Sequence, residues 1–468
     1  MSDWGGSTQK NRNAILVTID CLRADHLSCY GYERKTTPFM DYLAAKGIKF
    51  ENAFANGPFT VASFPSILAS AYPLEIHNQI PLSPDVVLIS EVLQRKGIKT
   101  AAVHSNPYLS TFYGYNRGWN YFQDFCRSIP YNKNLKRSSF RSAAKQCLPK
   151  KILEFYYFFK IFLGFTHIPY VDAETITRYS IAWLSRNKNR PFFLWIHYMD
   201  LHEPYSALNV KFERKYSKKV SRVMQAKIWK DMSKRKLNFK SIRKVIDIYD
   251  DKLSYIDKCV EKLFNVLDSE GLMESTLIIL TADHGQEFLD HGCFGHTARF
   301  YDEILHVPLI LFGPSAKKQI NCNLVSLLDV APTILSFYGI TVPVDYRGHN
   351  LLSKFTNPFI ISEAAHNEKG VYISSHQIFP SNFKTYAVRT ANWKFIRHES
   401  YCELYNLAKD PKETENVLDD EQEKFREFQS ILNKHILWEE KIRTRRSTII
   451  EKERLRRKIR KLKSLSSM

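Results

Sequence analysis

The sequence predicts an α/β fold: a doubly wound, mostly parallel sheet flanked by helices, followed by a small C-terminal α+β part. Short apolar runs rich in β-branched residues alternate with helical patterns, which is typical of strands joined by crossover helices. The first run ends in an acid, Asp20, at the strand end where α/β sheets bind ligands. Hydrophobic residues form 44% of the 468 residues, enough for a sizeable core.

The predicted strands are short and continuously apolar, as buried parallel strands are. We place them at residues 13–20, 99–104, 192–197, 276–281 and 307–312. Helical patterns occupy residues 37–47, 89–96 and 246–270.

The chain divides into three predicted parts. Residues 1–352 form the catalytic α/β domain, residues 353–438 a smaller subdomain, and residues 439–468 a basic tail that is helical or disordered. Within the first part, residues 126–170 are basic and then aromatic, and residues 211–244 are rich in Lys and Arg. Both resemble insertions. The aromatic one either packs on the core or lies on a membrane surface.

The net charge of +20 favours anionic partners. The N-terminal residues lack an apolar signal-like segment, no run of about 18 apolar residues occurs, and the cysteines form no CxxC pair. We therefore expect a cytoplasmic protein, with peripheral contact to an anionic membrane as an open alternative. Nucleic-acid binding is disfavoured because no zinc-finger or RNP-type motif is present.

Ligand-type side chains follow two of the predicted strands. Asp20 ends the first, and Asp283-His284 follows the strand at 276–281. Alone, Asp20 is as well explained as a helix N-cap. Together the three side chains indicate a site for a divalent cation, and Ca²⁺, Mg²⁺, Mn²⁺ or Zn²⁺ suits oxygen and imidazole ligands.

A third motif, Ser63-Phe-Pro-Ser66, opens a helix between these two blocks. It would aim a hydroxyl at a helix N-terminus, where an anion is favoured. An ordinary Ser/Pro helix start explains the motif better when it is taken alone.

Together these motifs resemble the sulfatase family of the alkaline-phosphatase superfamily. The resemblance covers roughly residues 13–352 and implies an alkaline-phosphatase-like fold. It rests on the ordered segments 17–31, 37–53, 281–287, 291–297, 301–310 and 324–333.

The resemblance implies a role for each matching residue. Asp20, Asp283 and His284, with Ser63, would hold one divalent cation, Ca²⁺ being favoured. Ser63 occupies the position of the family's nucleophile, and His202 that of its leaving-group histidine. His104, Asn106 and His296 lie where the family has Lys and His side chains that hold the substrate anion.

Three departures distinguish this chain from the family's pattern. Ser63 replaces the Cys that is oxidised to formylglycine, Ile67 replaces an Arg, and Cys21 replaces a second acid that binds the metal. We therefore expect Ser63 to stay unmodified and to act as a metal-activated nucleophile.

The predicted function is hydrolysis of sulfate esters of a glycan, lipid or small molecule. Phosphodiester, phosphonate or phosphoryl-transfer chemistry in the same superfamily is the alternative. A second alternative is a catalytically inactive protein that only binds anions.

Overall fold

The computed structural model describes residues 12–76, 82–125, 170–203, 205, 213–221, 224, 227–228, 238–366 and 383–466. Nearly all of the expected insertion at 126–170, and much of the one at 211–244, lies outside these residues.

An eight-stranded sheet forms the centre of the molecule, in the order β10-β2-β9-β6-β1-β5-β3-β4. All neighbours are parallel except β9, which runs antiparallel to both β2 and β6. The strands are β1 (Asn13–Ile19), β2 (Ile48–Phe54), β3 (Lys99–Val103), β4 (Tyr121–Gln123), β5 (Phe192–Tyr198), β6 (Thr276–Ala282), β9 (Leu309–Phe312) and β10 (Gln319–Ser326). The prediction of a mostly parallel sheet is confirmed.

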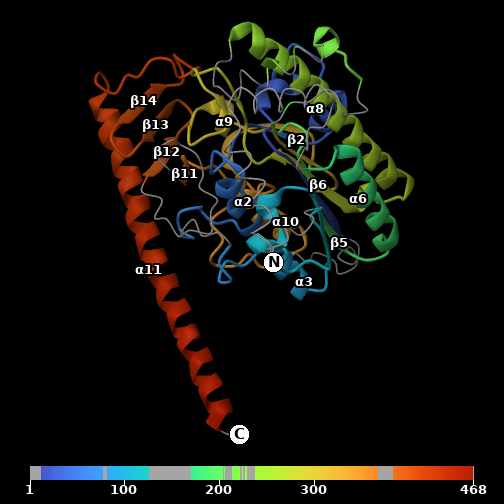
Figure 1. Ribbon diagram of the computed structural model, residues 1–468, viewed down its shortest axis with the longest axis vertical. Coiled ribbons are helices and arrows are strands. Elements are labelled where there is room, and N and C mark those ends of the chain that lie inside the picture. The colour runs from blue at the N-terminus through green and yellow to red at the C-terminus, as the bar shows by residue number, and fades with distance from the viewer. Residues whose placement is uncertain are drawn as a thin grey trace, which may run out of the picture.

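Helices cover both faces of this sheet (Figure 1). On one side α8 (Phe239–Ser269) packs against α6 (Ala173–Asn187) and α1 (Pro38–Lys46). On the other side α10 (Val330–Phe337) contacts α2 (Thr60–Ala69) and α3 (Ile89–Arg95). Because β1, β5 and β6 are buried along their whole length, their apolar runs face helices on both sides.

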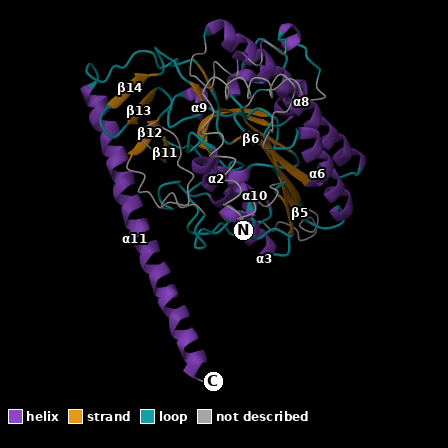
Figure 2. Cartoon of the chain, in the orientation of Figure 1, coloured by secondary structure: helices purple, strands orange, loops and turns teal. Residues whose placement is uncertain are grey.

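The C-terminal part is a four-stranded antiparallel sheet with a helix packed along it (Figure 2). Its strands are β11 (Ile360–His366), β12 (Phe383–Arg389), β13 (Trp393–Arg397) and β14 (Cys402–Asn406). Phe428 and Leu432 of the helix α11 (Gln422–Ser466) are buried in a second, smaller core against this sheet. The expected small α+β part is therefore present.

The predicted tail is the second half of α11, so the expected boundary at residue 439 falls inside one continuous helix. Part of it contacts the catalytic domain: the Arg446 guanidinium pairs with Glu75 at 3.2 Å and with Asp85 at 3.0 Å. Of the two forms expected for this tail, helical or disordered, its described residues adopt the helical one. Among the described residues, every helix is too short or too polar to span a bilayer.

Candidate active site

The sheet register brings the acids of the two motifs together. Strand β1 lies between β5 and β6, and Ile19 pairs with Ala282 in the parallel register. Asp20 and Asp283 therefore leave adjacent strands at the same edge. His284 Nε2 lies 3.5 Å from Asp283 Oδ2 and 4.0 Å from Asp20 Oδ1. The predicted convergence of the three side chains is what the structure shows, since ligand atoms of all three lie within 4.8 Å of one another.

The polar atoms of this cluster fit a divalent cation. Asp283 Oδ1 accepts the backbone N–H groups of Cys21 at 3.3 Å and His284 at 2.9 Å. Asp283 Oδ2 is buried and has no hydrogen-bond donor among the described residues. His284 Nδ1 donates to the Gly285 carbonyl at 2.9 Å, which leaves the Nε2 lone pair directed at the carboxylates. A cation is the partner that satisfies both groups.

Burial and neighbouring charges shift the pKa values of Asp20 and Asp283 in opposite directions. Burial and the negative charge of Asp20 raise the pKa of Asp283 to about 8. Burial also opposes ionisation of Asp20, but the His197 hydrogen bond and the charges of His202 and His284 hold its pKa well below the usual range. Burial lowers the pKa of His284, so its imidazole is neutral, as a metal ligand must be.

His197 is a site residue that the sequence motifs did not reveal. It lies on β5 opposite Thr18 of β1, and its Nε2 is 3.4 Å from Asp20 Oδ2. Its Nδ1 shares a hydrogen bond of 2.9 Å with the Thr18 hydroxyl, which fixes the ring. Its place inside the apolar run 192–197 made it look like a core residue.

Of the two residues expected to hold the anion after β3, the structure brings one to the acids. Asn106 Nδ2 donates to Asp20 Oδ2 at 3.1 Å. His104 is fully buried and stacks on Trp195, with the ring centroids 5.1 Å apart, and edge-on against Phe122. Burial and the nearby His197 keep its pKa well below the ordinary value. This environment is that of a core histidine.

Two hydroxyls of α2 lie at the site. The Ser63 hydroxyl, the predicted nucleophile, donates to the backbone carbonyl of Asp283 at 2.6 Å. Thr60, the first residue of the helix, places Oγ1 3.4 Å from Asp20 Oδ2 and 3.4 Å from His284 Nε2. Thr60 therefore faces the ligand groups themselves. The sequence did not indicate Thr60, because the Ser-x-Pro-Ser motif begins at Ser63, one helical turn later.

Two histidines form the mouth of the site. His202 and His296 are partly exposed, with ring centroids 4.9 Å apart, whereas Asp20, Asp283 and His284 are fully buried. His296 Nδ1 donates to Gln286 Oε1 at 2.8 Å, and burial together with the charges of His284 and His202 lowers its pKa well below the ordinary value.

Cys21 turns back into the cluster in a left-handed backbone conformation, with φ 59°. Such a φ costs a non-glycine residue of order 1–3 kcal/mol and persists only where its surroundings fix it. The fixing contacts are the Cys21 N–H on Asp283 Oδ1 and the Tyr249 hydroxyl, which donates to the Cys21 carbonyl at 2.8 Å. The thiol is fully buried, with Sγ 2.9 Å from Asp20 Oδ1.

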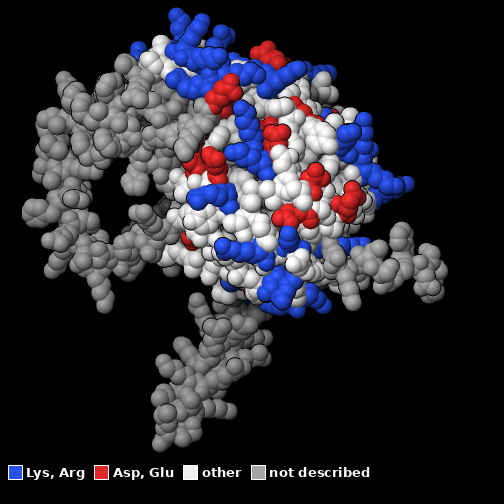
Figure 3. All heavy atoms as spheres, turned by 90° about the vertical axis from the view of Figure 1, so that its right-hand side faces the viewer, with Lys and Arg blue, Asp and Glu red and all other residues white. Residues whose placement is uncertain are grey.

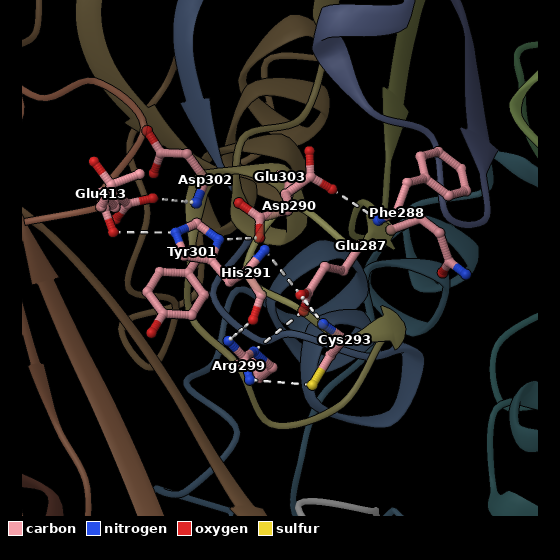
Figure 4. Close-up of polar contacts among 12 residues, drawn as sticks. Glu287, Phe288, Asp290, His291, Cys293, Arg299, Tyr301, Asp302, Glu303 and Glu413 are labelled. Carbon is pink, nitrogen blue, oxygen red and sulfur yellow. Dashed lines mark hydrogen bonds and ion pairs between the residues drawn. The ribbon is translucent and has the colours of Figure 1, made fainter. Parts of the chain in front are cut away.

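A polar network holds the loop that carries His296, between β6 and α9 (Asp302–Leu305), as Figure 4 shows. His291 Nδ1 lies 2.7 Å from Glu303 Oε1, and its Nε2 donates to the Glu413 carbonyl at 3.1 Å. Arg299 pairs with Glu287 at 3.1 Å in the same loop. Glu413 belongs to the C-terminal part, so that part fixes one wall of the site.

The fold and this site define a hydrolase of ester bonds with an α/β catalytic domain. Residues 12–340 match the family model Sulfatase, and residues 290–441 match a model described as N-sulphoglucosamine sulphohydrolase, C-terminal. The first match covers more than half of the chain, and the chain belongs to the sulfatase family, the hydrolases of sulfate esters. Arylsulfatase K of Bos taurus is 24% identical over 442 residues, which cover 86% of this chain and 78% of the relative.

Solved structures of the same fold are similar over nearly the whole chain. A 2-O GAG sulfatase superposes with a TM-score of 0.66 at 20% identity, covering 92% of this chain and 93% of the other. A structure in complex with its substrate D-glucosamine-2-N,6-O-disulfate gives 0.66 at 18%, covering 91% and 97%. The phosphonate monoester hydrolase of Agrobacterium radiobacter gives 0.67 at 18%, covering 92% and 96%. These structures support the alkaline-phosphatase-like fold expected from the sequence.

Proposed function

We propose that the protein cleaves sulfate esters with the Thr60 hydroxyl as nucleophile, at a divalent cation held by Asp20, Asp283 and His284. One observation carries this assignment: Thr60 Oγ1 is 3.4 Å from both Asp20 Oδ2 and His284 Nε2. The sequence motif predicts Ser63 as the nucleophile instead, and that prediction remains untested. Its hydroxyl proton is committed to the Asp283 carbonyl, so Ser63 would have to break that bond before it attacked.

The chain's own groups account for each step of the reaction. When bound, the cation supplies Lewis-acid polarisation and lowers the pKa of the hydroxyl. Thr60 Oγ1 attacks sulfur as its proton passes to Asp20 Oδ2, 3.4 Å away, and the bond from sulfur to the ester oxygen breaks. His202, at the mouth, gives a proton to the leaving oxygen. Water then hydrolyses the sulfated Thr60, which releases sulfate and restores the hydroxyl.

Sulfated sugars are the substrate class that the comparisons support. One similar structure holds D-glucosamine-2-N,6-O-disulfate and another is a 2-O GAG sulfatase. The partly exposed His202 and His296 leave room for a leaving group outside the buried acids. The cytoplasmic location and a peripheral contact with an anionic membrane also stay proposals, and cosedimentation with anionic vesicles at low and high salt tests the latter.

Phosphonate or phosphate ester cleavage is the second candidate function. A threonine or serine hydroxyl cannot form the aldehyde hydrate that formylglycine uses to expel sulfate, and the similar phosphonate monoester hydrolase shares the fold. Aryl sulfate, aryl phosphate and phosphonate monoester substrates assayed side by side rank the two activities by kcat/KM.

Four variants of α2 test the nucleophile. We expect Thr60→Ala to lower kcat at least about a thousandfold, the scale on which loss of a nucleophile acts. Thr60→Ser, which keeps a hydroxyl, should retain measurable turnover. Ser66→Ala is the matched control, because Ser66 lies on the same helix and its buried hydroxyl donates to the Ala71 carbonyl just beyond the end of that helix. Near-normal turnover by a folded Thr60→Ala, with loss in Ser63→Ala, would return the role to Ser63.

A further inference from the structure

The ligand set around the acids contains more nitrogen and sulfur than a calcium site. Calcium takes six to eight oxygen ligands. Among the described residues, the oxygen-bearing side chains at the acids are Asp20, Asp283, Thr60, Asn106 and Ser63, and imidazoles surround them. Zinc accepts four ligands drawn from nitrogen, sulfur and oxygen, which is the composition of this cluster.

Cys21 brings the sulfur to the cation. Ligand atoms of Cys21, His284 and His296 lie within 4.8 Å of one another, and so do those of Asp20, Cys21 and His202. The Cys21 thiol donates a hydrogen bond to Asp20 Oδ1 at 2.9 Å. Two ligands of a tetrahedral zinc ion are separated by about 3.5 Å. A cation that replaced the thiol proton would therefore have Sγ and Asp20 Oδ1 as neighbouring ligands after a small outward shift.

The backbone at Cys21 supports the same interpretation. Its φ of 59° turns the residue inward, so that a fully buried thiol lies among carboxylates and not in an apolar pocket. A cysteine that served only as a small core residue would gain nothing from this conformation or these neighbours. Here the turned backbone holds Sγ against the Asp20 carboxylate.

We propose that Cys21 is a ligand of the resident cation and that it makes the site selective for Zn²⁺ over Ca²⁺. The inference rests on the proposed function in that it concerns the same cation. It does not depend on which hydroxyl attacks. Asp20, Asp283 and His284 hold the ion, and the Cys21 thiolate occupies the position that a second acid would otherwise fill.

Cobalt spectroscopy of the full chain tests the ligand directly. Metal-free protein is titrated with Co²⁺, and we expect a thiolate-to-cobalt charge-transfer band in the near ultraviolet that Zn²⁺ displaces stoichiometrically. Cys21→Ser and Cys21→Asp should still bind cobalt but lose the band. Cys21→Asp should also shift the ratio of the Zn²⁺ and Ca²⁺ dissociation constants towards calcium by at least about tenfold.

Cys29→Ser is the matched control, since Cys29 follows the same strand but its backbone N–H donates to Asp41 at 2.9 Å. It should keep the band. Circular dichroism melts of each metal-free variant show that it is folded. Cobalt bound by the wild type without the band overturns the role of Cys21 and leaves the proposed function standing. Failure of the wild type to bind any of the three cations overturns both.

Discussion

At the scale of single residues, Asp283 couples cation binding to protons. Burial and the Asp20 charge raise its pKa to about 8, so below that pH the metal-free side chain carries a proton that a cation must displace. The apparent affinity for the cation should therefore rise with pH most steeply below about pH 8; above it the Cys21 thiol, the proposed ligand, is the remaining source of a proton. Calorimetry in buffers of different ionisation enthalpy measures the released proton directly.

Asp283→Asn provides the control for this coupling. The amide keeps the shape of the side chain but has no proton to release and no charge to offer. We expect binding to be weaker by at least about tenfold and fewer protons to be released, because the Cys21 thiol, the proposed ligand, still loses its proton. Proton release that is unchanged in Asp283→Asn would place the coupling on another group.

The sequence predicted those site residues that follow a strand and missed those whose position depends on register. Asp20 and Asp283-His284 were found because a polar residue after an apolar run is visible in the chain itself. His197 was missed because only the pairing of Thr18 with His197 across β1 and β5 shows that it meets Asp20. Thr60 was missed because only one face of a helix points to the site. Which hydroxyl lies on that face depends on the residue at which the helix starts.

At the scale of elements, Lys394 of β13 joins the small sheet to the catalytic domain. Its ammonium is fully buried, 2.7 Å from Asp302 Oδ1 and 2.7 Å from Glu413 Oε1. Lys394→Ala would leave the buried Glu413 carboxylate without its cation, whereas Asp302 keeps its ion pair with Arg389 at 3.0 Å. We expect a loss of about 3–5 kcal/mol in the free energy of unfolding, measured with urea.

An exposed pair serves as the comparison for Lys394. Lys262 lies 3.1 Å from Glu174, and both side chains are about half exposed. Lys262→Ala should cost less than about 1 kcal/mol. A Lys394 variant that loses no more than this would show that the buried network contributes little.

The docking of α11 on the small sheet should weaken as pH rises. Burial and the charge of Glu363 raise the pKa of Glu439 to about 7, against partial relief from Arg443, Lys384 and His435. From about pH 4.5 to 7 the folded state keeps a proton that the unfolded state has lost, so the free energy of unfolding falls by about 3 kcal/mol as pH rises. The raised pKa of His435, which is 2.7 Å from Glu363, acts in the same direction.

Thermal melts across this pH range test the effect on α11. Glu439→Gln cannot ionise and should flatten the decline in Tm. Glu427→Gln on the same helix is the control, because Glu427 is half exposed and pairs with Lys424 at 2.7 Å. Equal slopes in the wild type and Glu439→Gln would exclude Glu439 as the source.

The bounds of strands and helices with continuous apolar runs were predicted closely. A strand at the edge of the sheet was not predicted. The predicted strand at 276–281 is β6, and the helical pattern at 246–270 is most of α8. Strand β10 was missed because it lies at the edge of the sheet, and its first residues are mostly polar and partly exposed. The sequence does not decide between a helical and a disordered tail, because the ion pairs that Arg446 makes with the domain depend on the folded chain.

At the scale of the whole molecule, the net charge of +20 gives a reason to expect steering of anionic substrates. Lys and Arg side chains gather at the top of the face that carries α6 and α8 (Figure 3). Exposed basic residues near the start of α8 and in the neighbouring turn are Lys218, Lys219, Lys240 and Arg243. The positive charge should attract a polysulfated chain far more strongly than a monosulfate, because the chain carries more negative charges.

Ionic strength separates attraction by this field from chemistry at the site. We expect kcat/KM for a polysulfated oligosaccharide to fall about tenfold between low and physiological salt, and kcat/KM for a small aryl sulfate to change much less. Reversing the charges of Lys218, Lys219, Lys240 and Arg243 should flatten the first dependence and leave the second unchanged. Because kcat depends on the buried acids and Thr60, it should be the same in this variant at saturating aryl sulfate. Parallel salt dependences for the two substrates would show that the surface charge plays no part in capturing the substrate.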